Sequence, residues 1–355
     1  QYFYFYIELD RPYQKVRTIN KNGRNKLLLV FPKTIDEIKL KVGMSGVDEN
    51  GAKLNLKHEI PDWNQNKILK NTQDQWNNEL NKIYFYSKDK DVMTNFYTGL
   101  YHSFLCPNLY MDVDGRYRGR DLEVHQLKDG EENYTVFSLW DTYRGTHPLF
   151  TITQQQRTNS FIQTFIRQFE QGGDLPVWEL SANETECMIG YHSVSVIADA
   201  AVKGLRGFDF NKALNAMITT AGLNEFGKRE FMLNGFISAG DEPESVSKTL
   251  EYAYDDYCIT KMIESRSDNP EEFNEYQMLK KHFINRSFNF INLFDPETKF
   301  MRARRSGLWF TPFDPAEVNF NYTEANSWQY SLYAPHAVGT LTDLLGGRKE
   351  LENWL

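Results

Sequence analysis

The segment from Tyr322 to Tyr330 places one carboxylic acid, Glu324, among aromatic and amide side chains. A carboxyl group that aromatic neighbours shield from water can stay protonated near neutral pH. Such a group can donate a proton to the leaving oxygen of a glycosidic bond. A structural interpretation is also open, in which Thr323 caps a helix and Glu324 is a first-turn acid favoured by the helix dipole.

Three further clusters combine aromatic rings with short polar groups, at 110–119, 138–144 and 178–185. Sugars bind through ring faces that stack on Trp or Tyr, while carboxylates, amides and guanidinium groups bind their hydroxyls. The clusters fall in long predicted loops, and long loops inside a compact domain are commonly functional. The pattern therefore favours a polyol ligand.

The composition is that of a globular protein, with 15% aromatic and 25% charged residues in a chain of 355. The net charge of -8 and the absence of a basic stripe make nucleic acid a poor partner. No apolar run is long enough to span a bilayer, and the first residues lack the pattern of a signal peptide. The three cysteines form no metal-binding cluster, and each is expected to be a buried free thiol.

The hydrophobic pattern changes once along the chain. Residues 2–8, 26–31 and 37–45 read as strands, and the polar stretch 51–86 reads as a linker helix. Beyond residue 91 helices dominate, and about eight are expected from the spacing. Their predicted ranges are 92–105, 137–154, 160–171, 185–203, 210–220, 246–265, 270–293 and 323–345. Pro270 at a helix start and Gly346–Gly347 at a helix end are the clearest boundary signals.

Several of these segments together resemble glycoside hydrolase family 92, the calcium-dependent exo-acting α-mannosidases. The matching motifs follow the family order and lie at 96–103, 107–119, 136–142, 176–192, 250–256 and 322–330. The resemblance implies a multidomain α and β fold: the end of an antiparallel β-sandwich at 1–50, a helical linker at 51–90 and a truncated (α/α)6 toroid at 91–355.

The resemblance also implies inverting hydrolysis of terminal α-mannosidic bonds in glycans such as N-glycans, with Glu324 as the general acid. It assigns Trp140 and Trp178 as apolar walls of the mannose pocket and Asp141 as a hydroxyl acceptor. Glu179 and Glu184 are further carboxylates for substrate binding, and Glu184 is the reserve candidate for the acid. Asp255 and Asp256 are expected to be structural, with only one of them facing inward. His102, His192 and His336 are expected to be packed core histidines.

The family's carboxy-terminal Asn-Glu-Pro-x-His-His and Gly-Asn-x-Asp-x-Gly-Gln-Met motifs, which supply metal-binding groups and the base, do not occur here. We therefore expect a middle fragment of a bacterial, secreted or periplasmic enzyme that is incomplete alone. Its calcium ligands, its base and its partner, the remainder of the enzyme, would lie outside. Two alternatives stay open: a non-catalytic mannose-binding fragment, and a different (α/α)6 glycosidase.

Overall fold

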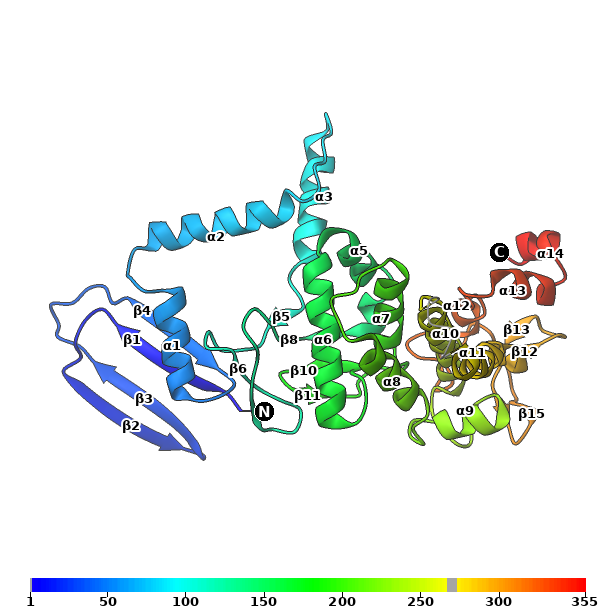
Figure 1. The fold of residues 1–355 in the computed structure, drawn as a ribbon. Helices are drawn as coiled ribbons and strands as arrows, with labels where there is room; N and C mark the ends of the chain where they lie inside the picture. Colours follow the sequence, from blue (N-terminus) through cyan, green and yellow to red (C-terminus); the bar gives the residue numbers. More distant parts are fainter. Residues whose placement is uncertain (1, 267–272) are drawn as a thin grey trace. The chain divides into compact units, whose positions relative to one another are not determined.

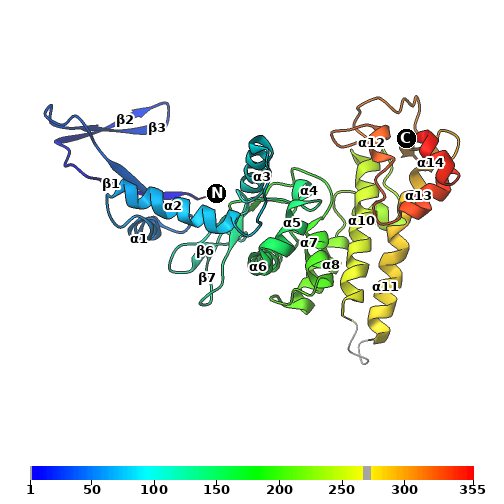
Figure 2. The ribbon, with the colours of Figure 1, turned by 90° about the horizontal axis from the view of Figure 1, so that it is seen from above.

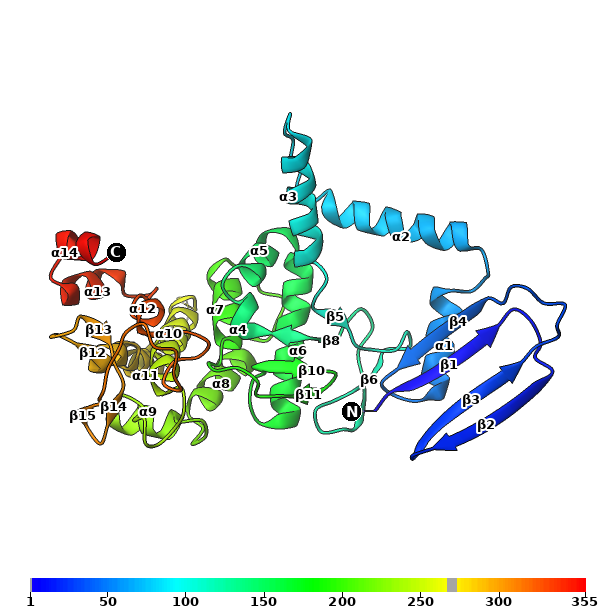
Figure 3. The ribbon, with the colours of Figure 1, turned by 180° about the vertical axis from the view of Figure 1, so that it is seen from behind.

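The computed structural model describes residues 2–266 and 273–355, and its chain forms two compact units. Unit 1 comprises Gln1–Leu105 and Leu109–Asn133, and unit 2 comprises Cys106–Asn108 and Tyr134–Leu355. Figures 1, 2 and 3 show the ribbon from the front, from above and from behind.

Unit 1 combines short antiparallel sheets with three helices (Figure 1). Its strands are β1 (Tyr4–Leu9), β2 (Lys15–Lys21), β3 (Arg24–Val30), β4 (Leu40–Ser45), β6 (Arg116–Arg118) and β7 (Val124–Gln126). Its helices are α1 (Glu49–Glu59), α2 (Gln65–Leu80) and α3 (Lys90–Ser103). Antiparallel pairs form between β1 and β4, β2 and β3, and β6 and β7. The strand β5 (Asn108–Leu109) lies where the chain passes between the units.

A buried carboxylate ties α1 to the loop before β6. Asp112 is 2% exposed and accepts hydrogen bonds from Ser45 Oγ and Asn55 Nδ2, both at 2.8 Å. Gly51 lies against this carboxylate, so a Cβ at position 51 would collide with Asp112 Oδ2. Burial raises the pKa of Asp112, while the two hydrogen bonds oppose that rise. The motif at 107–119 therefore contributes to the core of unit 1 through Asp112.

Unit 2 is built mainly from helices. They are α4 (Leu139–Thr142), α5 (Thr146–Thr153), α6 (Gln155–Gly172), α7 (Ser193–Val202), α8 (Phe210–Ala221), α9 (Lys228–Asn234), α10 (Ser245–Glu264), α11 (Phe273–Ser287), α12 (Ser327–Tyr330), α13 (Val338–Leu345) and α14 (Arg348–Trp354), with a 3-10 helix at Asn289–Leu293. Its short strands are β8 (Tyr134–Thr135), β9 (Phe137–Ser138), β10 (Trp178–Leu180), β11 (Asn183–Glu184), β12 (Phe294–Asp295), β13 (Phe300–Met301), β14 (Arg304–Arg305) and β15 (Leu308–Trp309).

The helix α10 forms the centre of unit 2. Most of its residues are buried, and it packs against α7, α8, α11 and α12. Figure 2 shows α10 and α11 running side by side. A helix that is buried nearly all round belongs to the core of a large helical assembly. Polar side chains on α10 can therefore contact chain segments that are distant in sequence.

The structure confirms most predicted elements and corrects several boundaries. The predicted helix 137–154 is broken at Tyr143–Gly145, and the predicted helix 185–203 begins only at Ser193. The segment 323–345 is not one helix: Asn326, not Thr323, caps α12, and α13 follows separately. The predicted linker helix at 51–86 is two helices, α1 and α2. The strand β2, the short strands from β5 to β15 and the helices α9 and α14 were missed, and Pro270 lies outside the described residues.

Predictions about three residue types, cysteine, histidine and aspartate, were wrong at some positions. Cys106 and Cys187 are exposed, and only Cys258 is buried. His102 is exposed, whereas His192 is a packed core histidine as expected, and His336 is half-buried with Nε2 2.8 Å from the Ser287 carbonyl. Asp255 and Asp256 are both fully buried, so the expectation that only one of them faces inward was also wrong.

Candidate active site

A three-stranded sheet brings two of the predicted pocket residues together. The strand order is β11-β10-β9, and Trp178 on β10 lies opposite Ser138 on β9, two residues before Trp140. Figure 3 shows β10 and β11 next to each other. Trp140 and Trp178 are both half-buried, and Asp141 is exposed and accepts a hydrogen bond from Ser138 Oγ. The chain therefore places two indoles and one carboxylate around the end of a small sheet.

Glu179 supports the turn between β10 and β11. Its carboxylate is fully buried and accepts hydrogen bonds from Thr135 Oγ1 at 3.0 Å and from the Ala182 amide at 2.6 Å. Ser181 and Ala182 form the turn with φ of 51° and 63°, a conformation that is strained for residues with a Cβ. Burial raises the pKa of Glu179 to about 7.

Glu184 is an acceptor for the backbone. Its Oε2 accepts from the Val177 amide at 2.9 Å, and its Oε1 accepts from the amides of Trp178, Thr185 and Glu186 at 2.9 to 3.0 Å. A carboxylate with four N–H donors fixes the chain on both sides of Trp178. This arrangement suits a supporting group better than a proton donor.

The carboxylate of Glu251, on α10, joins distant parts of unit 2. Its Oε1 accepts hydrogen bonds from Trp140 Nε1 at 3.1 Å and from the Tyr330 hydroxyl at 3.0 Å. Its Oε2 lies 2.8 Å from His192 Nε2. Glu251 is fully buried. The sequence predicts no role for Glu251 beyond its place in the motif at 250–256, because its partners are 111, 79 and 59 residues away along the chain.

His192 lies between two buried carboxylates. Its Nδ1 is 2.8 Å from Asp255 Oδ1, and the other Asp255 oxygen accepts from the Tyr191 amide at 2.8 Å. Burial alone would lower the pKa of His192, but Asp255 and Glu251 outweigh it and raise the pKa to about 9. The imidazole therefore carries a proton at neutral pH and balances part of the carboxylate charge.

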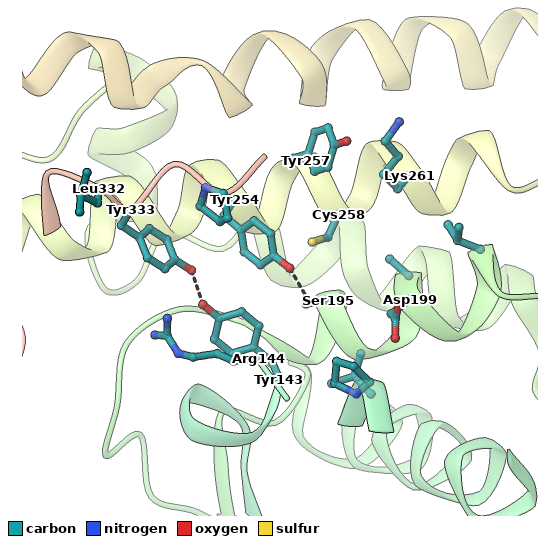
Figure 4. A pocket seen from close by; sticks show the side chains of 15 residues that line it. Tyr143, Arg144, Ser195, Asp199, Tyr254, Tyr257, Cys258, Lys261, Leu332 and Tyr333 are labelled. Atoms are coloured by element: carbon teal, nitrogen blue, oxygen red, sulfur yellow. Dashed lines mark hydrogen bonds between the residues drawn. The ribbon is translucent and has the colours of Figure 1, made fainter. Parts of the chain in front are cut away.

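A cavity of about 520 Å³ opens beside this network (Figure 4). It is rich in tyrosine, and its wall includes Tyr143, Arg144, Tyr254, Tyr257 and Tyr333. The hydroxyls of Tyr143 and Tyr333 are hydrogen-bonded, and that of Tyr254 is 3.0 Å from Ser195 Oγ. The Arg144 guanidinium lies over the ring of Tyr143 at 4.7 Å and over that of Trp140 at 5.4 Å.

Glu324 directly follows two anchored residues. The Thr323 amide donates to Ser247 Oγ at 2.8 Å, and the Tyr322 hydroxyl donates to the Met301 carbonyl at 2.8 Å. Glu324 itself has a φ of 50° and an exposed side chain, so the expected shielding by aromatic neighbours is not found. Within the described ranges, its carboxylate has neither a hydrogen bond nor an ion pair. A strained backbone at an exposed acid is a reason to consider a functional role.

The described residues do not by themselves supply a calcium site. They contain no group of three or more His, Cys, Asp or Glu side chains that could hold a metal ion. Glu251, His192 and Asp255 bond to one another in a row and do not face a common point. No step of the chemistry is therefore assigned to a metal.

Half-exposed indoles, a carboxylate beside them and an exposed acid are residue types that carbohydrate sites use. Residues 51–355 match the family model for the glycosyl hydrolase family 92 catalytic domain, and the chain belongs to this family. Over 99% of its length it is similar to a family 92 α-mannosidase from Bacteroides thetaiotaomicron, with 33% identity and a TM-score of 0.90. It is also similar to an inverting family 92 mannosidase from the same organism, with 27% identity, a TM-score of 0.87 and 99% of this chain covered.

The chain spans 49% of each of these two solved structures. Among curated proteins, an uncharacterized secreted glycosidase of Arthroderma benhamiae is 23% identical over 360 residues, which cover 88% of this chain and 41% of that protein. Among the described residues, none of the helices combines the length and the apolar character needed to cross a membrane.

Proposed function

We propose that the chain contributes to the active site of an exo-acting α-mannosidase that inverts the anomeric centre of terminal mannose in glycans. Glu324 is the general acid. Trp140 and Trp178 are the apolar walls of the mannose pocket, and Asp141 accepts a hydroxyl hydrogen bond. Glu179 and Glu184 serve substrate binding by fixing the sheet that carries Trp178.

One observation carries this proposal. Trp140 and Tyr330 donate to the same oxygen of Glu251, so the Trp140 loop and the segment that carries Glu324 meet at one buried point. The two elements that the family resemblance assigns to sugar binding and to proton donation are therefore neighbours in space. A different role for Glu324, such as a simple first-turn acid, would not require this convergence.

The chemistry assigned to this chain is proton donation. An inverting glycosidase protonates the leaving oxygen with one carboxylic acid, while a second carboxylate about 6.5 to 9.5 Å away activates water on the opposite ring face. The anchoring of Thr323 and Tyr330 on either side of Glu324 holds the acid in place. We assign the base to a part of the enzyme outside these 355 residues, either in the same polypeptide or in a separate chain.

Several finer expectations belong to the same proposal. They are a β-sandwich end at 1–50, a linker at 51–90 and part of an (α/α)6 toroid at 91–355. The calcium ion that the family implies would take most of its ligands from outside these residues. The likeness to a secreted glycosidase supports a secreted or periplasmic location. Mannoside substrates are supported by a solved family 92 relative that is described in complex with mannoimidazole, to which the chain is 32% identical.

The test is Glu324→Gln in the natural gene product that contains these residues. For a mannose disaccharide, we expect kcat to fall by about 10²- to 10⁴-fold, the usual contribution of a general acid. For an aryl mannoside with a dinitrophenolate leaving group, which needs no protonation, the loss should be much smaller. Glu317→Gln, an exposed acid earlier in the same loop, is the matched control.

Equal turnover of the disaccharide by Glu324→Gln and the parent protein would refute the assignment of the acid. Mannoside binding without hydrolysis by the parent protein would favour the non-catalytic alternative. Faster turnover of aryl α-glucosides than of aryl α-mannosides would favour a different toroid glycosidase.

A further inference from the structure

We propose that Glu251 is a positioning residue that sets the Trp140 indole and the Glu324 segment relative to each other. The inference rests on the proposed function for its catalytic consequence, but its structural core concerns Glu251, Trp140 and Tyr330 alone. Glu251 is fully buried, whereas Glu324 is exposed. It acts through the groups that it holds.

Two hydrogen-bond donors share one oxygen of the Glu251 carboxylate. Trp140 Nε1 at 3.1 Å and the Tyr330 hydroxyl at 3.0 Å share Glu251 Oε1. A carboxylate oxygen can accept two hydrogen bonds, and bonds to a charged acceptor are roughly twice as strong as neutral ones. The carboxylate is fully buried, so water does not compete for these positions. A displacement of either donor therefore loses a bond that water cannot replace.

The Glu251 carboxylate cannot rotate freely. Its other oxygen is 2.8 Å from His192 Nε2, and Asp255 binds the opposite ring nitrogen at 2.8 Å. Asp255 in turn accepts from the Tyr191 amide at 2.8 Å. The row of Glu251, His192 and Asp255 is thus fixed at its far end by the main chain.

One face of α10 carries the residues that bind the chain around Glu324. Ser247, Glu251 and Asp255 are spaced four residues apart, so they lie on one face of the helix. Ser247 binds the Thr323 amide just before Glu324, and Glu251 binds Tyr330 in the helix that follows. One face of α10 therefore fixes the chain on both sides of the proposed acid.

The helix that carries Trp140 is too short to fix the indole by itself. This residue belongs to α4, a helix of four residues without a side-chain cap. A short isolated turn of helix has little stability of its own. The bond to Glu251 is the one hydrogen bond of the indole among the described residues, so it sets the orientation of the ring.

Asp256 provides a matched control on the same helix. It is equally buried and accepts from the Tyr191 hydroxyl at 2.9 Å and from Arg286 Nε at 2.7 Å. In the part of the chain that the structure describes, neither of these hydrogen bonds reaches Trp140 or the segment 322–330. Loss of Asp256 should therefore destabilise the fold but disturb Trp140 less than loss of Glu251 does.

The experiment compares Glu251→Ala, Glu251→Gln and Asp256→Ala in the natural gene product. In protein labelled with 15N-tryptophan, the Trp140 indole signal is assigned by its absence in Trp140→Phe. We expect Glu251→Ala to speed hydrogen exchange of this indole by about tenfold or more, and Asp256→Ala to change it by much less. Glu251→Gln should retain most of the protection, because its amide oxygen can still accept from both donors.

The kinetic measurement separates positioning from general destabilisation. For a mannoside, Glu251→Ala should raise KM through the Trp140 wall and lower kcat through the Glu324 segment, with a combined loss of about 10²-fold in kcat/KM. Glu251→Gln should recover at least half of that loss on a logarithmic scale. Asp256→Ala should leave both constants near the parent values at temperatures where it is folded.

The proposal is overturned if Glu251→Ala changes indole exchange no more than Asp256→Ala does. It is equally overturned if an active parent loses as much kcat/KM with Asp256→Ala as with Glu251→Ala. If the parent protein hydrolyses no mannoside, the proposed function has failed, and the exchange measurement still decides the role of Glu251.

Discussion

The ring of Tyr143 lies flat on the imidazole of His192, with ring centroids 4.0 Å apart and an angle of 14° between the planes. The two ring nitrogens of His192 face carboxylates, so the phenol ring closes a remaining side. Tyr143 comes from the turn that interrupts the predicted helix 137–154, and its hydroxyl meets that of Tyr333. The break between α4 and α5 therefore places the Tyr143 ring against the imidazole of His192.

Substitution of Tyr143 should separate the stacking from the hydroxyl contact. Tyr143→Phe keeps the ring on His192 and loses one hydrogen bond, so we expect a loss of about 1 kcal/mol in the free energy of unfolding. Tyr143→Ala also leaves a cavity over His192, and we expect a loss of about 3 to 5 kcal/mol. Urea unfolding of both variants measures the difference. Equal losses would mean that the stacked ring contributes nothing beyond its hydroxyl.

Gly190 has a conformation and a contact that together exclude a side chain. Its φ is 80°, and a Cβ there would lie 2.4 Å from Nε2 of His192. Gly204 has a similar φ of 85° but nothing within 4 Å of its Cβ position. Gly204→Ala should therefore cost only the left-handed backbone term, about 1 kcal/mol, whereas Gly190→Ala should cost several times more and displace His192.

Thermal unfolding of these two alanine variants and of the parent protein gives the comparison. A loss of stability in Gly190→Ala no larger than that in Gly204→Ala would show that the imidazole can move aside. The His192 row would then be less rigid than the positioning role of Glu251 requires.

The raised pKa of His192 predicts a specific dependence of stability on pH. The unfolded histidine titrates near 6.5 and the folded one at about 9. The folded state therefore binds the proton more tightly, and this stabilisation is fully present below pH 6.5 and lost as the pH rises through about 9. We expect the free energy of unfolding to fall between pH 6.5 and 9.5, with a smaller fall in His192→Gln. Parallel curves for the two proteins over this window would contradict the prediction.

Much of the helical scaffold could be predicted from the sequence, because local periodicity determines it. The helix α10 was expected at 246–265 and found at Ser245–Glu264, and α8 was expected at 210–220 and found at Phe210–Ala221. Where long-range contacts decide the local structure, the prediction from the sequence was wrong. The segment 323–345 has helical spacing, but the bonds of Tyr322 and Ser327 to the Met301 carbonyl favour a turn over a continuous helix.

The candidate site also contains residues that local sequence patterns reveal and residues that only long-range contacts reveal. Trp140, Asp141, Trp178 and Glu324 were selected from local clusters of aromatic and polar residues, and nothing in the structure tests their roles directly. Glu251 could not be selected in this way, because its role depends on hydrogen-bond partners that are distant in sequence and come close only in the folded chain. A signal did exist: Glu251, Asp255 and Asp256 put three acids on a helix too apolar to be exposed on all sides, which indicates buried acids with partners.

The buried pair of Asp256 and Arg286 should behave as a unit. Asp256 Oδ2 accepts from Arg286 Nε at 2.7 Å, and both side chains are buried. Removal of one partner leaves an uncompensated buried charge, so Arg286→Met or Asp256→Leu alone should cost about 3 to 5 kcal/mol. The double variant should recover part of this loss, since two apolar groups need no charge partner. Additive losses in a double-mutant cycle measured by urea unfolding would show that the pair is not coupled.

Glu179 should make unit 2 less stable at alkaline pH than at acidic pH. Burial raises its pKa from 4.5 to about 7 in the folded state, so the folded protein binds this proton more tightly than the unfolded chain does. That stabilisation is fully present below pH 4.5 and lost as the pH rises through about 7. Glu179→Gln keeps an acceptor for the Ala182 amide and has no proton to lose, so its free energy of unfolding should fall less between pH 5 and pH 8, by about 2 kcal/mol.

Asp256, whose pKa is also raised by burial to about 7, titrates in the same range in both proteins, so it cancels in the comparison. The matched control is Glu184→Gln, because Glu184 lies opposite Glu179 in the sheet and binds backbone amides. It should lower stability and flatten the curve less than Glu179→Gln does, because it removes only the repulsion by the Glu184 charge, a smaller cause of the raised pKa of Glu179 than burial. If Glu179→Gln and the parent lost stability equally between pH 5 and pH 8, the carboxylate of Glu179 would have to be ionised in the fold throughout that range. The strained turn at Ser181 and Ala182 would then be held by a charged acceptor.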